Sequence, residues 1–245
     1  PPTGTGHDPR GWQRRATMTD RPIGPASITI TENGPYLATG GLPVVRRRMV
    51  ASEHGEPMTW ETTSAVDAPD AVALCRCGQS DDKPFCDGSH VAAGFDGTET
   101  AEASTYDQRQ TTYPATGIVM RDDRSICQHA GFCGNRITNV WKMVRGDDTE
   151  DTVTRAHLMA MIERCPSGAL TFRLAEGGAD IEPELRSEIG VVDDGPLFVT
   201  GGVPVRRADG QEMEARNRMT LCRCGGSGNK PFCDGSHKEN GFADS

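Results

Sequence analysis

Large apolar side chains are scarce in this sequence of 245 residues. Leu, Ile, Val and Phe together make up 40 residues, about 16% of the chain, and aromatic residues make up only 5%. With a formal net charge of −9, such a composition is close to that of chains that cannot build a good apolar core. The chain should therefore be disordered, or something other than apolar packing should hold it together.

Other absences exclude whole classes of function. No stretch approaches the ~20 apolar residues that a membrane-spanning helix needs. The 35 acidic residues outnumber the 26 basic ones, and no basic stripe is present, so we expect no nucleic-acid partner. No glycine-rich nucleotide-binding motif or P-loop occurs, and we therefore expect that the chain is not an enzyme in its own right.

The nine cysteines are the feature that the sequence has in excess. No charged segment followed by an apolar run opens the chain, so we expect no secretory signal. An odd number of cysteines in a chain without such a signal argues against a disulfide framework and favours metal or redox chemistry. Reduced thiols also favour the bacterial cytoplasm as its location.

An internal repeat organises the chain. Residues 34–47 read GPYLATGGLPVVRR, and residues 195–207 read GPLFVTGGVPVRR. Alternating apolar residues, a Gly-Gly pair and a proline-containing second strand predict a β-hairpin in each copy. The first copy carries about 14 extra residues around 51–69, which we interpret as a longer hairpin tip or loop that contains Trp60.

The repeat resumes in two cysteine-rich segments, CRCGQSDDKPFCDGSH at 75–90 and CRCGGSGNKPFCDGSH at 222–237. Each offers three thiols and one imidazole at the same spacing. Inert packed cysteines would not repeat such a set, and zinc sites usually use a wider knuckle than C-x-C, so iron–sulfur is favoured over zinc. The candidate ligands are Cys75, Cys77, Cys86 and His90 in the first copy and Cys222, Cys224, Cys233 and His237 in the second.

The pattern C-x-C-x2-S-x3-P-x-C-D-G-S-H resembles the CDGSH iron–sulfur domain family at all of its motif positions, in both copies. This resemblance implies one [2Fe–2S] cluster per copy. The inner iron would be held by Cys75 and Cys77, and the outer iron by Cys86 and His90. Because single-motif relatives form intertwined homodimers, the resemblance also implies a monomeric, intramolecular pseudo-dimer here. Protonation of His90 or His237 would make the clusters labile to acid.

Further motif residues are expected to support the ligands. We interpret Asp87 and Asp234 as caps that accept hydrogen bonds from the free N–H groups of a following helix. The hydroxyl groups of Ser80 and Ser227 are expected to donate hydrogen bonds to a cluster sulfur and so to tune it.

A third unit lies between the copies. Strands are predicted at 111–120, 138–144 and 169–174, a helix at 155–164 and an acidic loop at 146–151. Its C-x5-C … C-P pattern resembles the divergent mono-cluster ferredoxin domain, with Cys127, Cys133 and Cys165 as ligands. Ala130 replaces the middle loop cysteine of that family, which favours a [3Fe–4S] cluster. A [4Fe–4S] cluster with His129 as fourth ligand is the alternative, and structural packing of the three cysteines is another.

The expected fold is thus a β-rich α+β protein with two CDGSH-type β units in a pseudo-dimer and a small ferredoxin-like α+β unit between them. Its expected parts are a tail at 1–20 that is disordered or foreign to the native chain, a first CDGSH domain at 21–104, a ferredoxin-like domain at 105–176, a linker at 177–192 with a short helix near 182–189, and a second CDGSH domain at 193–245.

The expected function is electron transfer between redox protein partners, without membrane or nucleic acid. A redox- or pH-responsive sensor, or a donor of clusters to an apo-protein acceptor, is the alternative. A structural zinc module and a subunit of an oxidoreductase are two further possibilities.

Removal of the metal centres should unfold the chain, because metal–ligand bonds add folding free energy where apolar contacts are few. We expect far-UV circular dichroism to show loss of structure after anaerobic chelation of the iron. A well-folded apo form would contradict this expectation.

Overall fold

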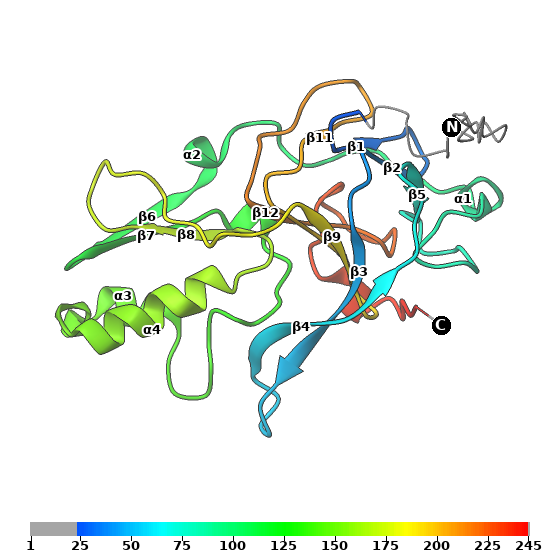
Figure 1. Ribbon diagram of the computed structural model, residues 1–245. Helices are drawn as coiled ribbons and strands as arrows, with labels where there is room; N and C mark the ends of the chain where they lie inside the picture. Colours follow the sequence, from blue (N-terminus) through cyan, green and yellow to red (C-terminus); the bar gives the residue numbers. More distant parts are fainter. Residues whose placement is uncertain (1–23, 245) are drawn as a thin grey trace, which may run out of the picture.

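The computed structural model describes residues 24–244 and contains two β-sheets that the two repeat copies share (Figure 1). The first copy forms β1 (Ser27–Ile30), β2 (Tyr36–Thr39), β3 (Val44–Ala51), β4 (Pro57–Val66), β5 (Val72–Leu74) and α1 (Ser89–Ala92). The second copy forms β9 (Glu188–Val192), β10 (Leu197–Thr200), β11 (Val205–Arg206), β12 (Arg218–Leu221) and a 3₁₀ turn at Ser236–Lys238.

The first copy gives β3 and β4 to the sheet of the second copy, and the second copy gives β11 to the sheet of the first. The strand orders are β11-β1-β2-β5 and β12-β10-β9-β3-β4. The exchanged strands pair in parallel, with Ile28 of β1 opposite Val205 of β11 and Val44 of β3 opposite Ile189 of β9. This exchange makes the two copies an intertwined pair within one chain, which confirms the predicted β-rich pseudo-dimer.

The Gly-Gly pairs mark the points where the chain leaves one sheet for the other. Gly40 and Gly41 both have positive φ, and a Cβ on Gly40 would lie 2.5 Å from the Cα of Ala26. Only glycine tolerates both conditions. The predicted hairpin across the Gly-Gly pair is therefore wrong, and β2 pairs with β1 and β5 instead. The strand that follows finds its partner in the other copy, where the N–H of Ile189 donates to the carbonyl of Pro43 at 2.9 Å.

The extra residues of the first copy form a long antiparallel hairpin. β3 and β4 continue well beyond the strands of the second copy, with Val44 opposite Val66 at the base and Ala51 opposite Pro57 at the tip. Figure 1 shows this hairpin projecting from the shared sheets beside the central unit. We call it the β3–β4 arm.

The central unit is a three-stranded antiparallel sheet with two helices on one face (Figure 1). Its elements are α2 (Tyr106–Arg109), β6 (Thr111–Ala115), β7 (Ile118–Asp122), α3 (Val140–Arg145), α4 (Thr152–Glu163) and β8 (Leu170–Arg173), with 3₁₀ turns at Arg124–Ile126 and Asp147–Glu150.

Two of the strand predictions for this unit need correction. The single strand predicted at 111–120 is the hairpin β6–β7, because Gly117 takes a positive φ and reverses the chain. The strand predicted at 138–144 is the helix α3. Its start is fixed by the side chain of Asn139, which accepts a hydrogen bond from the N–H of Lys142 at 2.9 Å. The predicted helix at 155–164 and strand at 169–174 are confirmed within a few residues by α4 and β8.

The segment after β8 also differs from the prediction. No helix forms at 182–189, and residues 188–192 of the predicted linker form β9, which lies inside a sheet between β10 and β3. Pairing with both neighbours decides this conformation, and a single sequence does not reveal those neighbours. The predicted tail at 1–20 lies outside the described residues.

One apolar core runs through all three units. Its buried members include Ile28 from the first copy, Phe172 from the central unit and Leu221 from the second copy. Each unit is too small to form a stable core of its own. The three units therefore bury their few large apolar residues together in one shared core.

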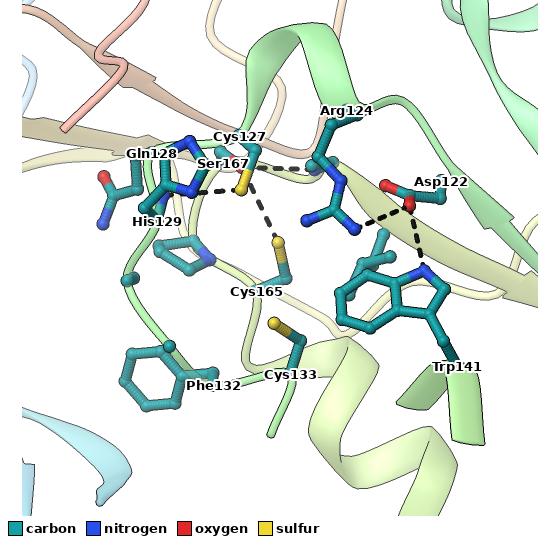
Figure 2. A pocket seen from close by; sticks show the side chains of 15 residues that line it. Asp122, Arg124, Cys127, Gln128, His129, Phe132, Cys133, Trp141, Cys165 and Ser167 are labelled. Atoms are coloured by element: carbon teal, nitrogen blue, oxygen red, sulfur yellow. Dashed lines mark hydrogen bonds and ion pairs between the residues drawn. The ribbon is translucent and has the colours of Figure 1, made fainter. Parts of the chain in front are cut away.

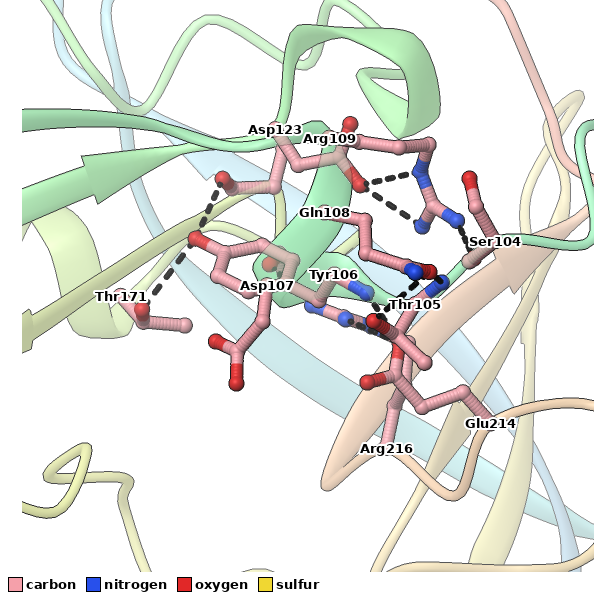
Figure 3. A network of polar contacts seen from close by, with 12 residues as sticks. Ser104, Thr105, Tyr106, Asp107, Gln108, Arg109, Asp123, Thr171, Glu214 and Arg216 are labelled. Atoms are coloured by element: carbon pink, nitrogen blue, oxygen red, sulfur yellow. Dashed lines mark hydrogen bonds and ion pairs between the residues drawn. The ribbon is translucent and has the colours of Figure 1, made fainter.

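A polar junction ties the central unit to the second copy (Figure 3). The ring of Tyr106 lies between two guanidinium groups, with Arg121 at 4.8 Å and Arg216 at 4.5 Å from its centroid. The Tyr106 hydroxyl donates to the carbonyl of Ala169 at 3.1 Å, and its backbone N–H donates to the carboxylate of Glu214 at 2.8 Å.

Arg218 of β12 strengthens the same junction from inside the protein. Its side chain is 2% exposed. It donates to the carbonyl groups of Cys165 at 2.6 Å, Ile162 at 3.2 Å and Leu170 at 3.1 Å, all at or beyond the end of α4. A strand of the second copy thereby supplies the hydrogen bonds that these buried carbonyls need.

Substitution of Arg218 should show how much this junction contributes to the stability of the folded protein. We expect Arg218→Ala to lower the free energy of unfolding by about 3 kcal/mol, since it leaves buried carbonyls and Glu182 without their partner. The control is Arg206→Ala, which breaks an exposed ion pair with Glu212 and should cost less than about 1 kcal/mol. Urea denaturation measures the free energy of unfolding of both variants. Equal decreases in the two variants would contradict the role of Arg218 in this junction.

Candidate functional site

Each cysteine-rich segment begins where the last strand of its copy ends. We call residues 75–90 the first motif and residues 222–237 the second motif. In the first motif, the N–H of Cys75 donates to the carbonyl of Pro84 at 2.8 Å, and the N–H of Cys86 donates to the carbonyl of Ala73 at 2.9 Å. These bonds fold the loop back on β5. They bring Cys86 and His90 toward the cysteines at the start of the motif.

The four candidate ligands of the first motif approach one another in two pairs. The sulfurs of Cys75 and Cys77 are 3.8 Å apart, and the sulfur of Cys86 lies 3.4 Å from Nδ1 of His90. Cys75 and Cys77 are buried, whereas Cys86 and His90 are only half-buried.

The second motif repeats these pairs almost unchanged. The sulfurs of Cys222 and Cys224 are 3.8 Å apart, and the sulfur of Cys233 lies 3.3 Å from Nδ1 of His237. Within residues 24–244, no three Cys, His, Asp or Glu side chains gather closely enough to hold a single metal ion. The approach of the ligands is pairwise in both motifs.

The electrostatics of the second motif reflect its burial. Desolvation raises the pKa of Cys233 to about 12. The Cys222 thiol donates to the Cys224 sulfur, which raises the pKa of Cys222 and lowers that of Cys224. Burial, together with the charges of Lys238 and Arg223, lowers the pKa of His237. A buried thiol of this kind becomes a thiolate readily only beside a positive charge such as a metal ion.

The aspartates of the two motifs tie the ends of each loop together. The carboxylate of Asp87 accepts hydrogen bonds from the N–H groups of Ser89 and Asp81, both at 2.9 Å. Asp234 does the same for Ser236 at 3.0 Å and Gly228 at 2.8 Å. Each aspartate therefore satisfies an N–H at the start of the following turn, as expected, and also fixes the preceding loop.

The serines act differently from the sequence-based expectation. The hydroxyl of Ser80 donates to the carbonyl of Phe85, and that of Ser227 to the carbonyl of Phe232, both at 2.7 Å. Each hydroxyl thus satisfies a carbonyl across the tight loop in place of the predicted hydrogen bond to a sulfur.

The two motifs meet at their inner ligands. Cys77 and Cys224 form an antiparallel β-bridge. The glycine after each cysteine allows this approach, since a Cβ on Gly78 would lie 2.7 Å from the carbonyl oxygen of Cys224, and one on Gly225 would lie 2.5 Å from that of Cys77.

The third candidate site is a cavity of about 160 Å³ in the central unit (Figure 2). Cys127 follows the 3₁₀ turn, Cys133 precedes α3, and Cys165 follows α4. Figure 2 shows the three sulfurs turned toward one another. Burial raises the pKa of Cys133 to about 11 and also raises that of Cys127. Three unpaired thiols around one cavity suit a cluster better than they suit packing.

His129 lines the same cavity and touches both the central unit and the second motif. Its N–H donates to the sulfur of Cys127 at 3.4 Å, and its φ of +59° is unusual for a residue other than glycine. Its ring also faces the second motif, where a Cβ on Gly235 would lie 3.7 Å from its Cδ2 atom. Its role as a fourth ligand stays a prediction.

Several residues around this cavity escaped the sequence analysis. The guanidinium of Arg124 lies 4.3 Å from the ring centroid of Trp141, whose Nε1 donates to Asp122 at 3.0 Å. Burial raises the pKa of Asp122, although Arg124 and Trp141 oppose that shift. The positive charge of Arg124 opposes the rise in the pKa of Cys127. No sequence pattern marks these residues.

The β3–β4 arm explains the extra residues of the first copy. Trp60, whose role the sequence left open, packs against Phe132 at 5.2 Å and Phe198 at 5.5 Å between ring centroids. The carboxylate of Glu56 accepts a hydrogen bond from the N–H of Arg136 at 2.7 Å. The arm therefore supports the loop that carries Cys133.

Comparison with known families agrees with this geometry. The family model described as the iron-binding zinc finger of CDGSH type matches residues 33–91 and 194–238, and that of the divergent 4Fe-4S mono-cluster matches residues 113–175. The chain carries two CDGSH segments around a divergent mono-cluster segment. The resemblances inferred from the sequence are confirmed, and iron–sulfur cofactors are supported.

The matched CDGSH segments contain all eight candidate ligands of the two motifs, and the matched mono-cluster segment contains Cys127, Cys133 and Cys165. No curated protein and no solved structure matches the chain significantly. Among the described residues, no helix has the length and apolar character needed to cross a bilayer.

Proposed function

We propose that this chain is an electron-transfer protein with two [2Fe–2S] clusters and one ferredoxin-type cluster, and not an enzyme in its own right. The observation that supports the proposal is the pairwise approach of the ligands in both CDGSH sites. The partners would be redox proteins that supply or accept single electrons. The nine free cysteines favour a reducing compartment such as the bacterial cytoplasm.

The distances within each pair fit two ligands of one tetrahedral metal. With metal–sulfur bonds of about 2.3 Å and metal–nitrogen bonds of about 2.0 Å, two sulfurs should be about 3.8 Å apart and a sulfur and a nitrogen about 3.5 Å apart. The observed separations are 3.8 Å for both cysteine pairs and 3.4 and 3.3 Å for the two Cys–His pairs. The C-x-C spacing is therefore not too tight for one metal.

The separation into two pairs favours a two-iron cluster over zinc. One tetrahedral zinc would draw all four ligands to a single point, whereas a [2Fe–2S] cluster takes two protein ligands on each iron. Replacing one thiolate with a neutral imidazole removes a negative charge from the ligand set. The reduction potential should then be higher than that of an all-cysteine site, as two histidines raise it further in Rieske centres.

The central cavity offers three thiolates, which is the number that a [3Fe–4S] cluster needs. A [4Fe–4S] cluster with His129 as the fourth ligand is the alternative. In both cases the chain's own part is to hold the sulfurs of Cys127, Cys133 and Cys165 and to place Arg124 near their negative charge. When bound, the cluster would supply a one-electron redox couple.

Quantitation of iron and acid-labile sulfide, combined with EPR, tests the proposal. We expect about seven iron atoms per chain, or about eight with a [4Fe–4S] centre. The CDGSH signals should appear on reduction, and a [3Fe–4S] signal should appear in the oxidised protein. The variant Cys165→Ser should lose the central signal alone. A colourless protein with stoichiometric zinc would contradict the proposal.

A difference between the two CDGSH sites favours a second candidate function, donation of a cluster from the first site. Cys233 is 2% exposed, whereas its counterpart Cys86 is half-buried. Likewise Gly235 is buried and Gly88 is exposed. The outer ligand pair of the first site is therefore the more accessible one.

Incubation with an apo-ferredoxin acceptor tests this candidate. We expect the first site to lose its cluster to the acceptor, or to a chelator, at least several times faster than the second. His90→Cys should slow the loss at the first site, and His237→Cys is the matched control. Equal rates at the two sites in the wild-type protein would rule out selective donation.

A further inference from the structure

We propose that the second CDGSH site is the internal relay of this protein, so that electrons pass between the central site and the first site by way of the second site. This inference rests on the proposed electron-transfer function. Its basis is that the loop at residues 125–136, which carries Cys127 and Cys133, packs against the second motif. We call this segment the central loop.

Two side chains of the second motif region hold the central loop. The Nζ of Lys238 donates to the carbonyl of His129 at 2.5 Å, and the Nδ2 of Asn229 donates to the carbonyl of Ser125 at 2.7 Å. The two hydrogen bonds lie on either side of Cys127. They fix the backbone around this ligand against the second motif.

Between these bonds the two backbones are in direct contact at a glycine. Gly235 has a φ of +93°, and a Cβ on it would lie 3.1 Å from the carbonyl oxygen of Gln128. Gln128 is itself buried, and its Oε1 has no hydrogen-bond partner among the described residues. The interface is thus closely packed at this point, with no room for an intervening side chain.

This contact gives a short route between ligands of different sites. Gln128 is bonded directly to Cys127, and Gly235 follows Cys233 by only two residues. The route from Cys127 to Cys233 therefore consists of covalent bonds and one van der Waals step. Electrons tunnel more readily through bonded and hydrogen-bonded atoms than across gaps.

The first motif lacks each element of this contact. Asp82 stands where the second motif has Asn229, and Val91 stands where the chain later has Lys238. Both residues are exposed. Gly88, the counterpart of Gly235, has nearly the same φ of +91°, yet no described atom lies within 4 Å of a Cβ built on it. Among the described residues, these three contacts therefore join the central site to the second CDGSH site and have no counterpart in the first motif.

The second and first sites are joined in turn at the pseudo-twofold axis. The β-bridge between Cys77 and Cys224 brings the backbones of two ligands together. With clusters bound, each transfer of one electron would oxidise the donating site and reduce the accepting one, and the second site would return to its starting state after the onward transfer. No proton and no further redox agent takes part between the sites.

Paired glycine variants and EPR relaxation test the relay. In fully reduced protein, all three centres should be paramagnetic, and a nearby central cluster should speed the spin relaxation of the second-site signal more than that of the first. His90→Cys and His237→Cys assign the two signals. Gly235→Ala should reduce this enhancement several-fold, whereas Gly88→Ala carries the same backbone strain in open space and should leave it unchanged.

If Gly235→Ala loses its cluster, a second pair of variants tests the same contact between the central loop and the second motif. Lys238→Val gives the second motif the residue of the first, and Val91→Lys makes the reverse change. Lys238→Val removes the charge-assisted hydrogen bond to the carbonyl of His129. The equilibrium constant for docking of the central loop on the second motif should then fall about tenfold. The relaxation enhancement should weaken, and the iron content should stay the same.

Two failures can be told apart. If the wild-type protein shows no iron–sulfur signals, the proposed function fails. If all signals are present but the central cluster relaxes both CDGSH signals equally, or relaxes the first more strongly, the relay is wrong while the proposed function stands.

Discussion

The exchange of β3 and β11 between the two sheets is the interaction on which the rest of the structure depends. It pairs β1 with β11 and β3 with β9, so that each of the two sheets contains strands from both copies. It also brings the ends of β5 and β12 together, where Cys77 and Cys224 form a bridge across the pseudo-twofold axis. A chain with few large apolar residues thereby obtains one continuous core.

The symmetry of the repeat is broken by the segments that differ between the copies. The long β3–β4 arm of the first copy supports one side of the central loop through Trp60 and Glu56. The second motif region supports the other side through Asn229 and Lys238. The insertion of a third unit therefore gives two nearly identical ligand sets different surroundings, and this difference allows different roles.

The sequence predicted the fold class, the pseudo-dimer and the candidate ligands, because the ligand spacing repeats and because the motif is specific. It did not predict the path of the strands. The Gly40-Gly41 pair is typical of a hairpin turn, and only the pairing partner in the other copy shows that the chain crosses over. α3 was mistaken for a strand since Asn139, its N-cap, stands in an apolar stretch without a clear helical period. Contacts such as that between Gln128 and Gly235 join segments more than a hundred residues apart and leave no local pattern.

The central claim is that the ligands act in pairs on separate iron atoms. Anomalous scattering measured at the iron absorption edge from a crystal of the intact protein tests it most directly. The account predicts two iron peaks in each CDGSH site, one beside Cys75 and Cys77 and one beside Cys86 and His90, with the same pattern in the second motif. A single metal peak surrounded by all four ligands of a motif would contradict it.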